Sequence, residues 1–117
     1  MRTPKNLLYK GVVVAELEKF GYEFPWASAK ANFIDHQLFH KLETLSSFNR
    51  YSEELEDMEL SDEDEEKLWE KKRLELGLSL EDLKLDSDEF WSVVCDDGTE
   101  DEVRALSCED QWLEWRA

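Results

Sequence analysis

The sequence contains few of the residues from which many active sites are built: its 117 residues include only four glycines, two prolines and two cysteines. So few glycines leave almost no material for a phosphate-binding loop, and neither a Ser-His-Asp pattern nor a nucleophile elbow is present. Cys95 and Cys108 do not form a disulfide framework, although a hairpin centred near Asp101 and Glu102 would bring them face to face. The sequence therefore predicts free thiols and a protein that is not an enzyme.

Long apolar runs are also missing. No segment approaches the roughly 20 apolar residues of a membrane span, and Val12–Ala15 is too short for a signal peptide, because Glu16 follows at once. Yet the chain is 41% hydrophobic and has five tryptophans, which is too rich for a disordered acidic tail. We expect one folded, monomeric domain over residues 1–117, located in the cytoplasm and near the nucleoid through its partner.

Basic side chains are scarce, and acidic ones far outnumber them in the second half. Residues 1–50 carry seven basic and five acidic side chains, whereas residues 51–117 carry seven and twenty-five, so the net charges of +2 and −18 sum to −16. Nucleic acid and anionic membranes both attract clusters of Lys and Arg. The charge therefore argues against direct binding to either, and favours a basic partner.

In the first half, the hydrophobic pattern changes from a strand period to a helix period. Residues 6–18 are rich in β-formers and predict a hairpin around Lys10-Gly11, interrupted again at Gly21. Residues 24–33 alternate with period two, and Pro25 fits the start or edge of that strand. Leu38, Leu42 and Leu45 then form a helical stripe, with Asp35 as N-cap and an end near Arg50.

In the second half, a helix is predicted from Ser61, which forms a capping-box pattern with Asp64, to a C-cap at Gly77. A helical turn precedes it around Leu55 and Met58. Short strands are expected at 78–85, 90–95 and 103–106, with a turn at 96–99. Together these elements predict the α+β class: a mostly antiparallel sheet with two or three helices packed on it.

Patterns typical of metal sites are weak. His36 and His40 lie four residues apart, with Glu43 beside them, but the segment lacks the second-position Glu of an HExxH site and a third ligand is not identifiable. Neither acidic block fits the ligand spacing of an EF-hand loop. We expect two surface or half-buried histidines, no metal and no cofactor.

The most unusual stretch is EELEDMELSDEDEE, residues 53–66, in which ten of fourteen side chains are acidic and none is basic. As one helix it would be about 21 Å long, with roughly one carboxylate per 2 Å, close to the one charge per about 1.7 Å of duplex DNA. A second acidic block, DDGTEDE, spans residues 96–102. The predicted partner-binding carboxylates are Glu53, Glu54, Glu56, Asp57, Glu59, Asp62, Glu63, Asp64, Glu65, Glu66, Glu70, Asp96, Asp97, Glu100, Asp101 and Glu102.

In length, charge and these two segments, the chain resembles the small acidic DNA-mimic proteins of bacteria and phages, in particular those that bind the histone-like protein HU. The resemblance implies a monomer whose carboxylates stand in for phosphates and compete with DNA for a basic DNA-binding protein. An immunity protein that neutralises a basic nuclease toxin, or an anti-restriction inhibitor, would have the same composition. A fourth interpretation is an acidic subunit of an unrelated complex, and a fifth is a surface that is merely solvated.

Overall fold

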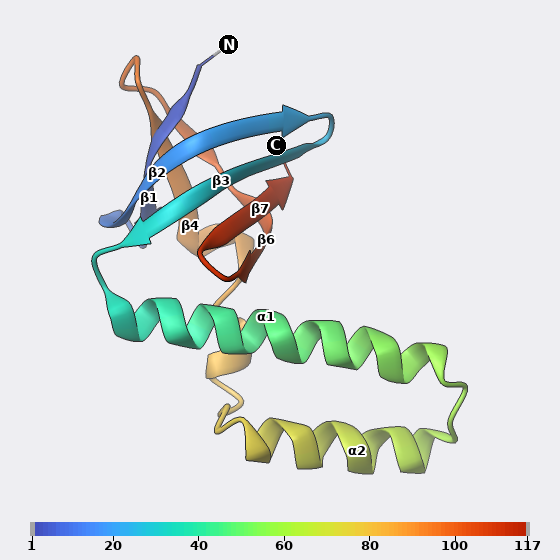
Figure 1. The fold of residues 1–117 in the computed structure, drawn as a ribbon. Coiled ribbons are helices and arrows are strands. Elements are labelled where there is room, and N and C mark those ends of the chain that lie inside the picture. Colours follow the sequence, from blue (N-terminus) through green and yellow to red (C-terminus); the bar gives the residue numbers. More distant parts are fainter. Residues whose placement is uncertain (1, 117) are drawn as a thin grey trace.

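The computed structural model describes residues 2–116, which form a curled sheet and a helical hairpin that extends away from it (Figure 1). The predicted α+β class, with a mostly antiparallel sheet and few helices, is confirmed. Two short 3-10 turns, Asp82–Lys84 and Asp88–Phe90, follow the hairpin. In chain order the elements are β1 (Pro4–Tyr9), β2 (Val12–Glu23), β3 (Trp26–Phe33), α1 (His36–Asp57), α2 (Asp62–Glu75), β4 (Trp91–Cys95), β5 (Glu100–Glu102), β6 (Arg104–Glu109) and β7 (Trp112–Arg116).

The sheet curls back on itself. Its strand order is β5-β4-β1-β2-β3-β7-β6, and every pairing is antiparallel. The two edge strands, β5 and β6, are consecutive in the chain and are separated only by the buried residue Val103. The two edges of the sheet must therefore lie close together, which gives the curled shape seen in Figure 1.

The hairpin of β1 and β2 turns at Lys10-Gly11, as predicted, but Gly21 does not end a strand. It lies within the twelve-residue strand β2, just after a register shift in the pairing with β3 between Glu18 and Gly21. Lys19 has a positive φ of 55° there. Such a bulge bends a strand and increases its twist, so β2 continues where the sequence predicted an interruption.

One apolar cluster fills the interior of the curled sheet. The period-two prediction for β3 is confirmed, because Ala27, Ala29 and Ala31 are buried while the side chains between them are more exposed. Leu38 and Leu42 of α1 join the same cluster. Burying a leucine side chain stabilises a fold by roughly 1.5–3 kcal/mol, so α1 is held to the sheet by its first three turns.

Helix α1 also covers the free edge of β6. The Oγ of Ser46, the buried polar residue in this core, accepts the backbone N–H of Cys108 at 2.9 Å. One turn earlier, the carboxylate of Glu43 accepts the N–H of Asp110 at 3.0 Å. An edge strand normally presents such donors to solvent or to another chain. These two side chains of α1 therefore provide hydrogen-bond acceptors for backbone N–H groups along β6 and in the turn after it, at the edge of the sheet.

The helix starts were predicted correctly, but the end of α1 was not. Asp35 caps α1 by accepting the N–H of Leu38 at 3.1 Å, and Ser61 caps α2 by accepting the N–H of Asp64 at 3.3 Å. However, α1 continues seven residues beyond Arg50, to Asp57. No glycine or proline interrupts this extension, and Leu55 provides it with a buried apolar side chain.

Helix α2 ends as predicted, at Gly77. The N–H of Leu78 donates to the carbonyl of Arg73 and the N–H of Gly77 to that of Leu74, both at 3.1 Å, and Gly77 has a φ of +70°. These two bonds define a Schellman motif, which needs a left-handed residue where Gly77 stands. The chain therefore reverses at Gly77 and returns toward the sheet.

Three predictions for the second half were wrong or incomplete. Residues 78–85 form a loop and a 3-10 turn rather than a strand, because the Schellman turn buries Leu78 and the Oγ of Ser79 accepts the N–H of Asp82 at 3.1 Å. Strand β4 pairs with β1 and β5, whereas the segment after Val103 pairs with β7. Cys95 and Cys108 therefore do not face each other across one hairpin, and both are free and buried.

Candidate functional site

The acidic run of residues 53–66 forms the far end of the helical hairpin. Residues 53–57 are the last residues of α1, residues 62–66 are the first of α2, and the connecting turn carries one more carboxylate. Figure 1 shows α2 on the side of α1 away from the sheet. We call these ten carboxylates the acidic tip: Glu53, Glu54, Glu56, Asp57, Glu59, Asp62, Glu63, Asp64, Glu65 and Glu66.

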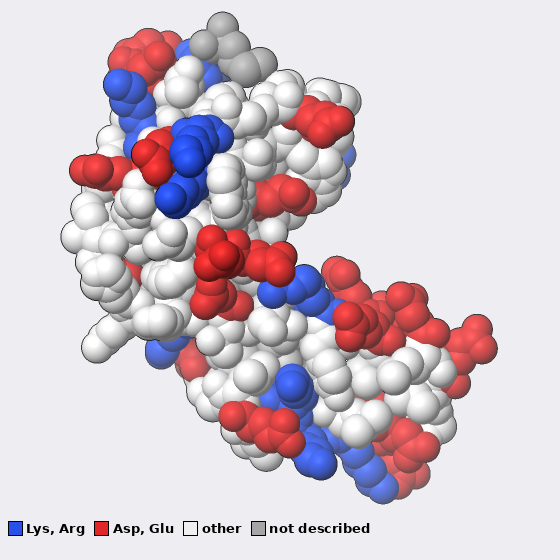
Figure 2. Space-filling model, viewed as in Figure 1, with Lys and Arg blue, Asp and Glu red and all other residues white. Residues whose placement is uncertain are grey.

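The acidic tip is almost entirely open to solvent. Nine of its ten side chains are exposed, and Glu65 is half-buried. Within residues 2–116, Glu63 is the one tip residue in an ion pair, with Lys67 four residues further along α2 at 3.1 Å. Figure 2 shows the acidic side chains gathered at the end of the helical arm, with Lys and Arg further back along it. Most of the tip charge is therefore free to meet an external cation.

The shape of the tip differs from the row that the sequence suggested. A single straight helix would spread the carboxylates over about 21 Å. Instead the chain reverses after Asp57, so five-residue segments of two antiparallel helices, each about 7.5 Å long, lie at the same end. Ten charges correspond to about 17 Å of duplex axis. The tip therefore concentrates these charges into a compact knob that is denser than a duplex.

The hairpin that carries the tip is held by few contacts. Helix α2 has no buried residue, and its link to α1 centres on Trp69, whose ring lies 5.3 Å from that of Phe48. Acidic residues occupy its first turn, and Lys72 and Arg73 its last, so both ends complement the helix dipole. Besides its own capping, helix α2 is thus held by Trp69, which packs in a small cluster with Leu45, Phe48 and Leu78, and by Lys72, whose ammonium lies 5.3 Å from the ring centre of Tyr51.

Glu70 belongs to the base of the hairpin rather than to the tip. Its carboxylate forms an ion pair with Arg73, whose side chain is only 11% exposed and also donates to the carbonyl of Leu78 at 2.7 Å. This pair anchors the Schellman turn. Replacing Glu70 would therefore disturb the hairpin itself, which makes it a poor position for testing partner contact.

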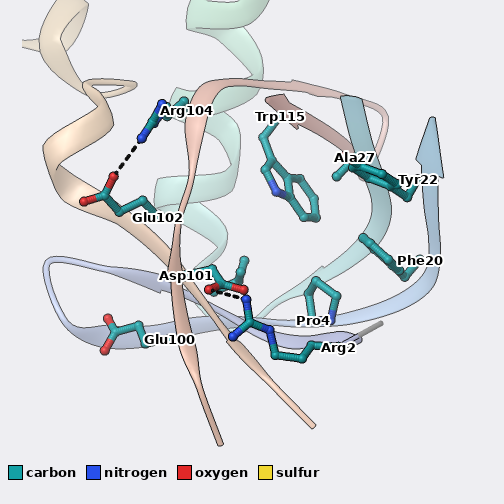
Figure 3. Close-up of a pocket in the computed structure, with 11 residues that line it drawn as sticks. Arg2, Pro4, Phe20, Tyr22, Ala27, Glu100, Asp101, Glu102, Arg104 and Trp115 are labelled. Atoms are coloured by element: carbon teal, nitrogen blue, oxygen red, sulfur yellow. Dashed lines mark hydrogen bonds and ion pairs between the residues drawn. The ribbon is translucent and has the colours of Figure 1, made fainter. Parts of the chain in front are cut away.

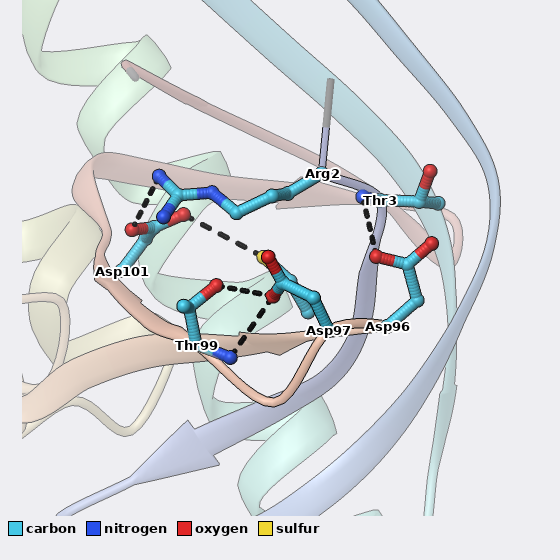
Figure 4. Close-up of polar contacts among 7 residues, drawn as sticks. Arg2, Thr3, Asp96, Asp97, Thr99 and Asp101 are labelled. Atoms are coloured by element: carbon cyan, nitrogen blue, oxygen red, sulfur yellow. Dashed lines mark hydrogen bonds and ion pairs between the residues drawn. The ribbon is translucent and has the colours of Figure 1, made fainter.

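The second acidic block lies on the hairpin of β4 and β5, and part of it has a structural role (Figure 4). Asp97 accepts the N–H of Thr99 at 3.0 Å and also its hydroxyl, and these bonds lower the pKa of Asp97. Asp96 accepts the N–H of Thr3 at 3.2 Å. Asp101 pairs with Arg2 at 3.1 Å. Three of the five carboxylates in this block therefore fix the turn and the start of β1.

The two acidic blocks lie far apart. The tip is at the free end of the helical hairpin, whereas the β4–β5 turn is beside the start of β1, at the opposite end of a molecule whose longest dimension is 50 Å (Figure 1). Among the predicted partner-binding residues, the structure brings together the ten of the tip. It places Asp96, Asp97, Glu100, Asp101 and Glu102 on a separate surface.

The histidines and cysteines form no second site. His36 and His40 are exposed on α1, and His40 lies against the ring of Phe39 at 5.5 Å. Over residues 2–116, no group of three His, Cys, Asp or Glu side chains is arranged to hold a metal ion. Burial, together with Glu43 nearby, raises the pKa of Cys108 to about 12. A thiol of that kind stays protonated and unreactive.

Comparisons with protein-family models, with curated proteins and with solved structures give no match for this chain. None of the helices in residues 2–116 is long and apolar enough to cross a membrane. The acidic tip is thus the candidate site that sequence and geometry share, and its chemistry is that of an exposed anionic surface.

Proposed function

We propose that this protein binds a basic DNA-binding protein through the acidic tip and so competes with DNA for it. The partner we favour is a histone-like protein of the HU type, in the cytoplasm, with this chain acting as a monomer. The observation that supports the proposal most is the exposure of nine carboxylates at the end of a protruding hairpin. A surface that served solubility alone would mix both signs of charge.

The mechanism is competition for the same cations. Histone-like proteins grip DNA with Lys and Arg, largely without contacts to bases. Each tip carboxylate can accept a charge-assisted hydrogen bond from one of these side chains, as a phosphate does. Because the tip is a knob, it suits a recess between basic arms better than an extended basic surface. Opposite charge also accelerates the encounter, so association is fast and sensitive to salt.

The direct test is a mobility-shift competition among the chain, a histone-like protein and a short DNA duplex. We expect excess chain to release the duplex at about 0.05 M salt and less of it at about 0.15 M, where screening is stronger. Binding of the chain to bare duplex is expected to be undetectable. A shifted DNA band that survives excess chain at both salt concentrations rules this partner out.

Two matched variants locate the contact, since each removes four exposed carboxylates that form no ion pair within residues 2–116. The tip variant is Glu53→Gln, Glu54→Gln, Glu56→Gln and Glu66→Gln. The sheet variant is Glu16→Gln, Glu23→Gln, Glu109→Gln and Glu114→Gln. We expect the tip variant to lose most competition, mainly through slower association, and the sheet variant to keep it. Equal losses would mean that net charge, rather than the tip, drives binding.

A pull-down from native lysate, at low and high salt, tests the class of partner. Retention of a histone-like protein at low salt supports the proposal. Retention of a basic nuclease instead would replace it with the immunity function, because such an inhibitor covers an active site rather than competing for a nucleoid protein. The tip variant serves as the control bait in both cases.

A further inference from the structure

Two arginines stand opposite each other at the ends of β6 and β7. Arg104 and Arg116 are partners in the register of this strand pair, so their side chains extend from the same face of the sheet. Like charges in directly opposite positions destabilise a pair of strands. Within residues 2–116, Arg116 forms no ion pair. The sheet therefore keeps a repulsive contact here that a bound anion would relieve.

Beside these two arginines lies a cavity of about 470 Å³, which both of them line. The end of the β2–β3 hairpin contributes Phe24 and Pro25 to the lining, and Asp88 of the second 3-10 turn and Ala105 of β6 complete it. The volume lies in the range of about 300–1,000 Å³ that is usual for small-ligand pockets. We call this space the arginine cavity.

The lining of the arginine cavity carries positive charge. Two guanidinium groups against the one carboxylate of Asp88 give it a net charge of +1, in a chain whose net charge is −16. That carboxylate accepts the backbone N–H of Ala105 at 3.0 Å, and it forms no ion pair with either arginine. Arginine binds carboxylates and phosphates through two parallel hydrogen bonds. The lining therefore selects an oxyanion.

A neighbouring cavity of the curled sheet differs in this respect (Figure 3). It is larger, about 590 Å³, but both of its arginines are paired: Arg2 with Asp101 at 3.1 Å, and Arg104 with Glu102 at 3.4 Å. The second pair joins side chains that are 63% and 81% exposed, and ion pairs of that kind contribute little to stability. An oxyanion in the arginine cavity can therefore compete with Glu102 for Arg104.

Phe24 gives the arginine cavity an apolar wall. Its side chain is 83% exposed, the largest exposed fraction among the large apolar residues of the described chain. Aromatic rings attract one another in offset or edge-to-face contact. A ligand whose oxyanion is held by the arginines could thus place a ring against Phe24, and the contact would remove apolar surface of both from water.

We propose that the arginine cavity binds a small ligand that carries an oxyanion on an aromatic ring, an aryl carboxylate or an aryl phosphate. The oxyanion lies between Arg104 and Arg116, and the ring lies against Phe24 and Pro25. A cationic ligand would add to the repulsion between the two arginines, and a neutral one would leave that repulsion in place. The inference does not rest on the acidic tip or on its proposed partner.

The test titrates the whole protein with benzoate and, separately, with phenyl phosphate, and follows the backbone amide signals of Ala105 and Arg116 by ¹H–¹⁵N NMR. Benzamide is the matched control without charge, and acetate is the control without a ring. We expect benzoate to move both signals in a saturable way and benzamide to bind about tenfold more weakly. The affinities of benzoate and phenyl phosphate show which oxyanion is preferred. Titrations at about 0.15 M salt screen repulsion by the acidic surface.

Two single variants locate the site. Arg116→Gln is expected to weaken benzoate binding by about tenfold, whereas Arg50→Gln on α1 makes the same change in charge and is expected to leave it unchanged. Both positions are exposed, and neither arginine forms an ion pair within residues 2–116, so both variants should fold.

Four results would each overturn the proposal. The first is equal binding of benzoate and benzamide, and the second is binding of acetate as tight as that of benzoate. The third is the absence of any saturable movement of the Ala105 and Arg116 signals with benzoate and with phenyl phosphate. The fourth is an effect of Arg50→Gln as large as that of Arg116→Gln, which would assign the binding to net charge.

Discussion

The curled sheet and the helical hairpin differ in how many apolar residues they bury and how much charge they carry. The cluster inside the curled sheet, with the first turns of α1, holds fifteen buried residues, whereas the cluster between the helices holds three: Leu45, Phe48 and Leu78. The hairpin, in turn, carries the ten carboxylates of the acidic tip. The residues that hold the fold together and the residues that carry most of the excess charge therefore lie in different parts of the molecule.

This separation has a physical advantage. Like charges crowded beside a core oppose folding, because their repulsion acts on the compact state. At the end of a solvated arm the same repulsion is weakened by water and salt. The remaining repulsion then destabilises a helix that contributes little to the core. A dense anionic surface can thus be kept without weakening the sheet that supports it.

The largest effect that this comparison predicts comes from matched leucine truncations. Leu7 is completely buried in β1, and Leu74 of α2 is 63% exposed. We expect Leu7→Ala to lower the free energy of unfolding by about 3 kcal/mol, and Leu74→Ala by no more than about 0.5 kcal/mol. Urea unfolding measures both. Similar losses for the two variants would mean that the hairpin belongs to the cooperative core.

A second prediction concerns the contact that joins the helices. Replacing Trp69 by alanine removes its packing on Phe48 and should reduce the local opening free energy of α2 by about 2 kcal/mol, since the ring is only half-buried. Hydrogen exchange should accelerate in residues 62–75 and stay unchanged in the sheet. Faster exchange in β1 or β4 as well would show that the hairpin also stabilises the sheet.

A third prediction is that the fold loses stability at alkaline pH through Cys108, which lies in the sheet. The pKa of Cys108 rises from 9.0 to about 12 in the fold, so the unfolded chain loses this proton at lower pH than the folded chain does. The stabilisation is complete below pH 9 and is lost as the pH rises toward 12, with about 1 kcal/mol of it gone at pH 10. Denaturation curves should show this loss, and Cys108→Ala should remove it. A loss that persists in the variant belongs to other groups.

The smallest expected effect is that of salt on the tip. Raising the ionic strength from about 0.01 M to about 0.1 M shortens the Debye length from about 30 Å to about 10 Å. Weaker repulsion should raise the melting temperature by about 2 °C. The four-residue tip variant, with fewer charges to screen, should show a smaller rise. A fall in melting temperature would mean that attractive ion pairs outweigh the repulsion.

Local signals in the sequence predicted much of the fold. The alternation in residues 26–33, the leucine stripe of α1 and the caps at Asp35, Ser61 and Gly77 all act through neighbours in the chain, and all are found in the structure. The bulge after Glu18 and the assignment of β5 to β4 depend on partners far away in sequence. No local pattern encodes those choices, and there the predictions were wrong.

The candidate site was predicted in composition but not in shape. Counting carboxylates identified residues 53–66, yet their arrangement depends on where α1 ends and the chain reverses. The extension of α1 to Asp57 rests on the burial of Leu55, which the sequence assigned to a separate helical turn before α2 rather than to the end of α1. The role of Glu70 depends likewise on Arg73 and the Schellman turn, a contact that spacing alone does not distinguish from a solvated pair.

The strand order also bears on how the chain is completed during synthesis. Strands β1, β2 and β3 leave the ribosome first, but β1 pairs with β4 and β3 with β7, as in Leu7 with Val93 and Ala29 with Leu113. The first three strands therefore keep both outer edges unpaired until the final quarter of the chain has emerged. Pairings of such long sequence separation form slowly, and unpaired edges invite association with other chains. The contacts within the helical hairpin join residues that are close in sequence, so the hairpin can form before the sheet is complete.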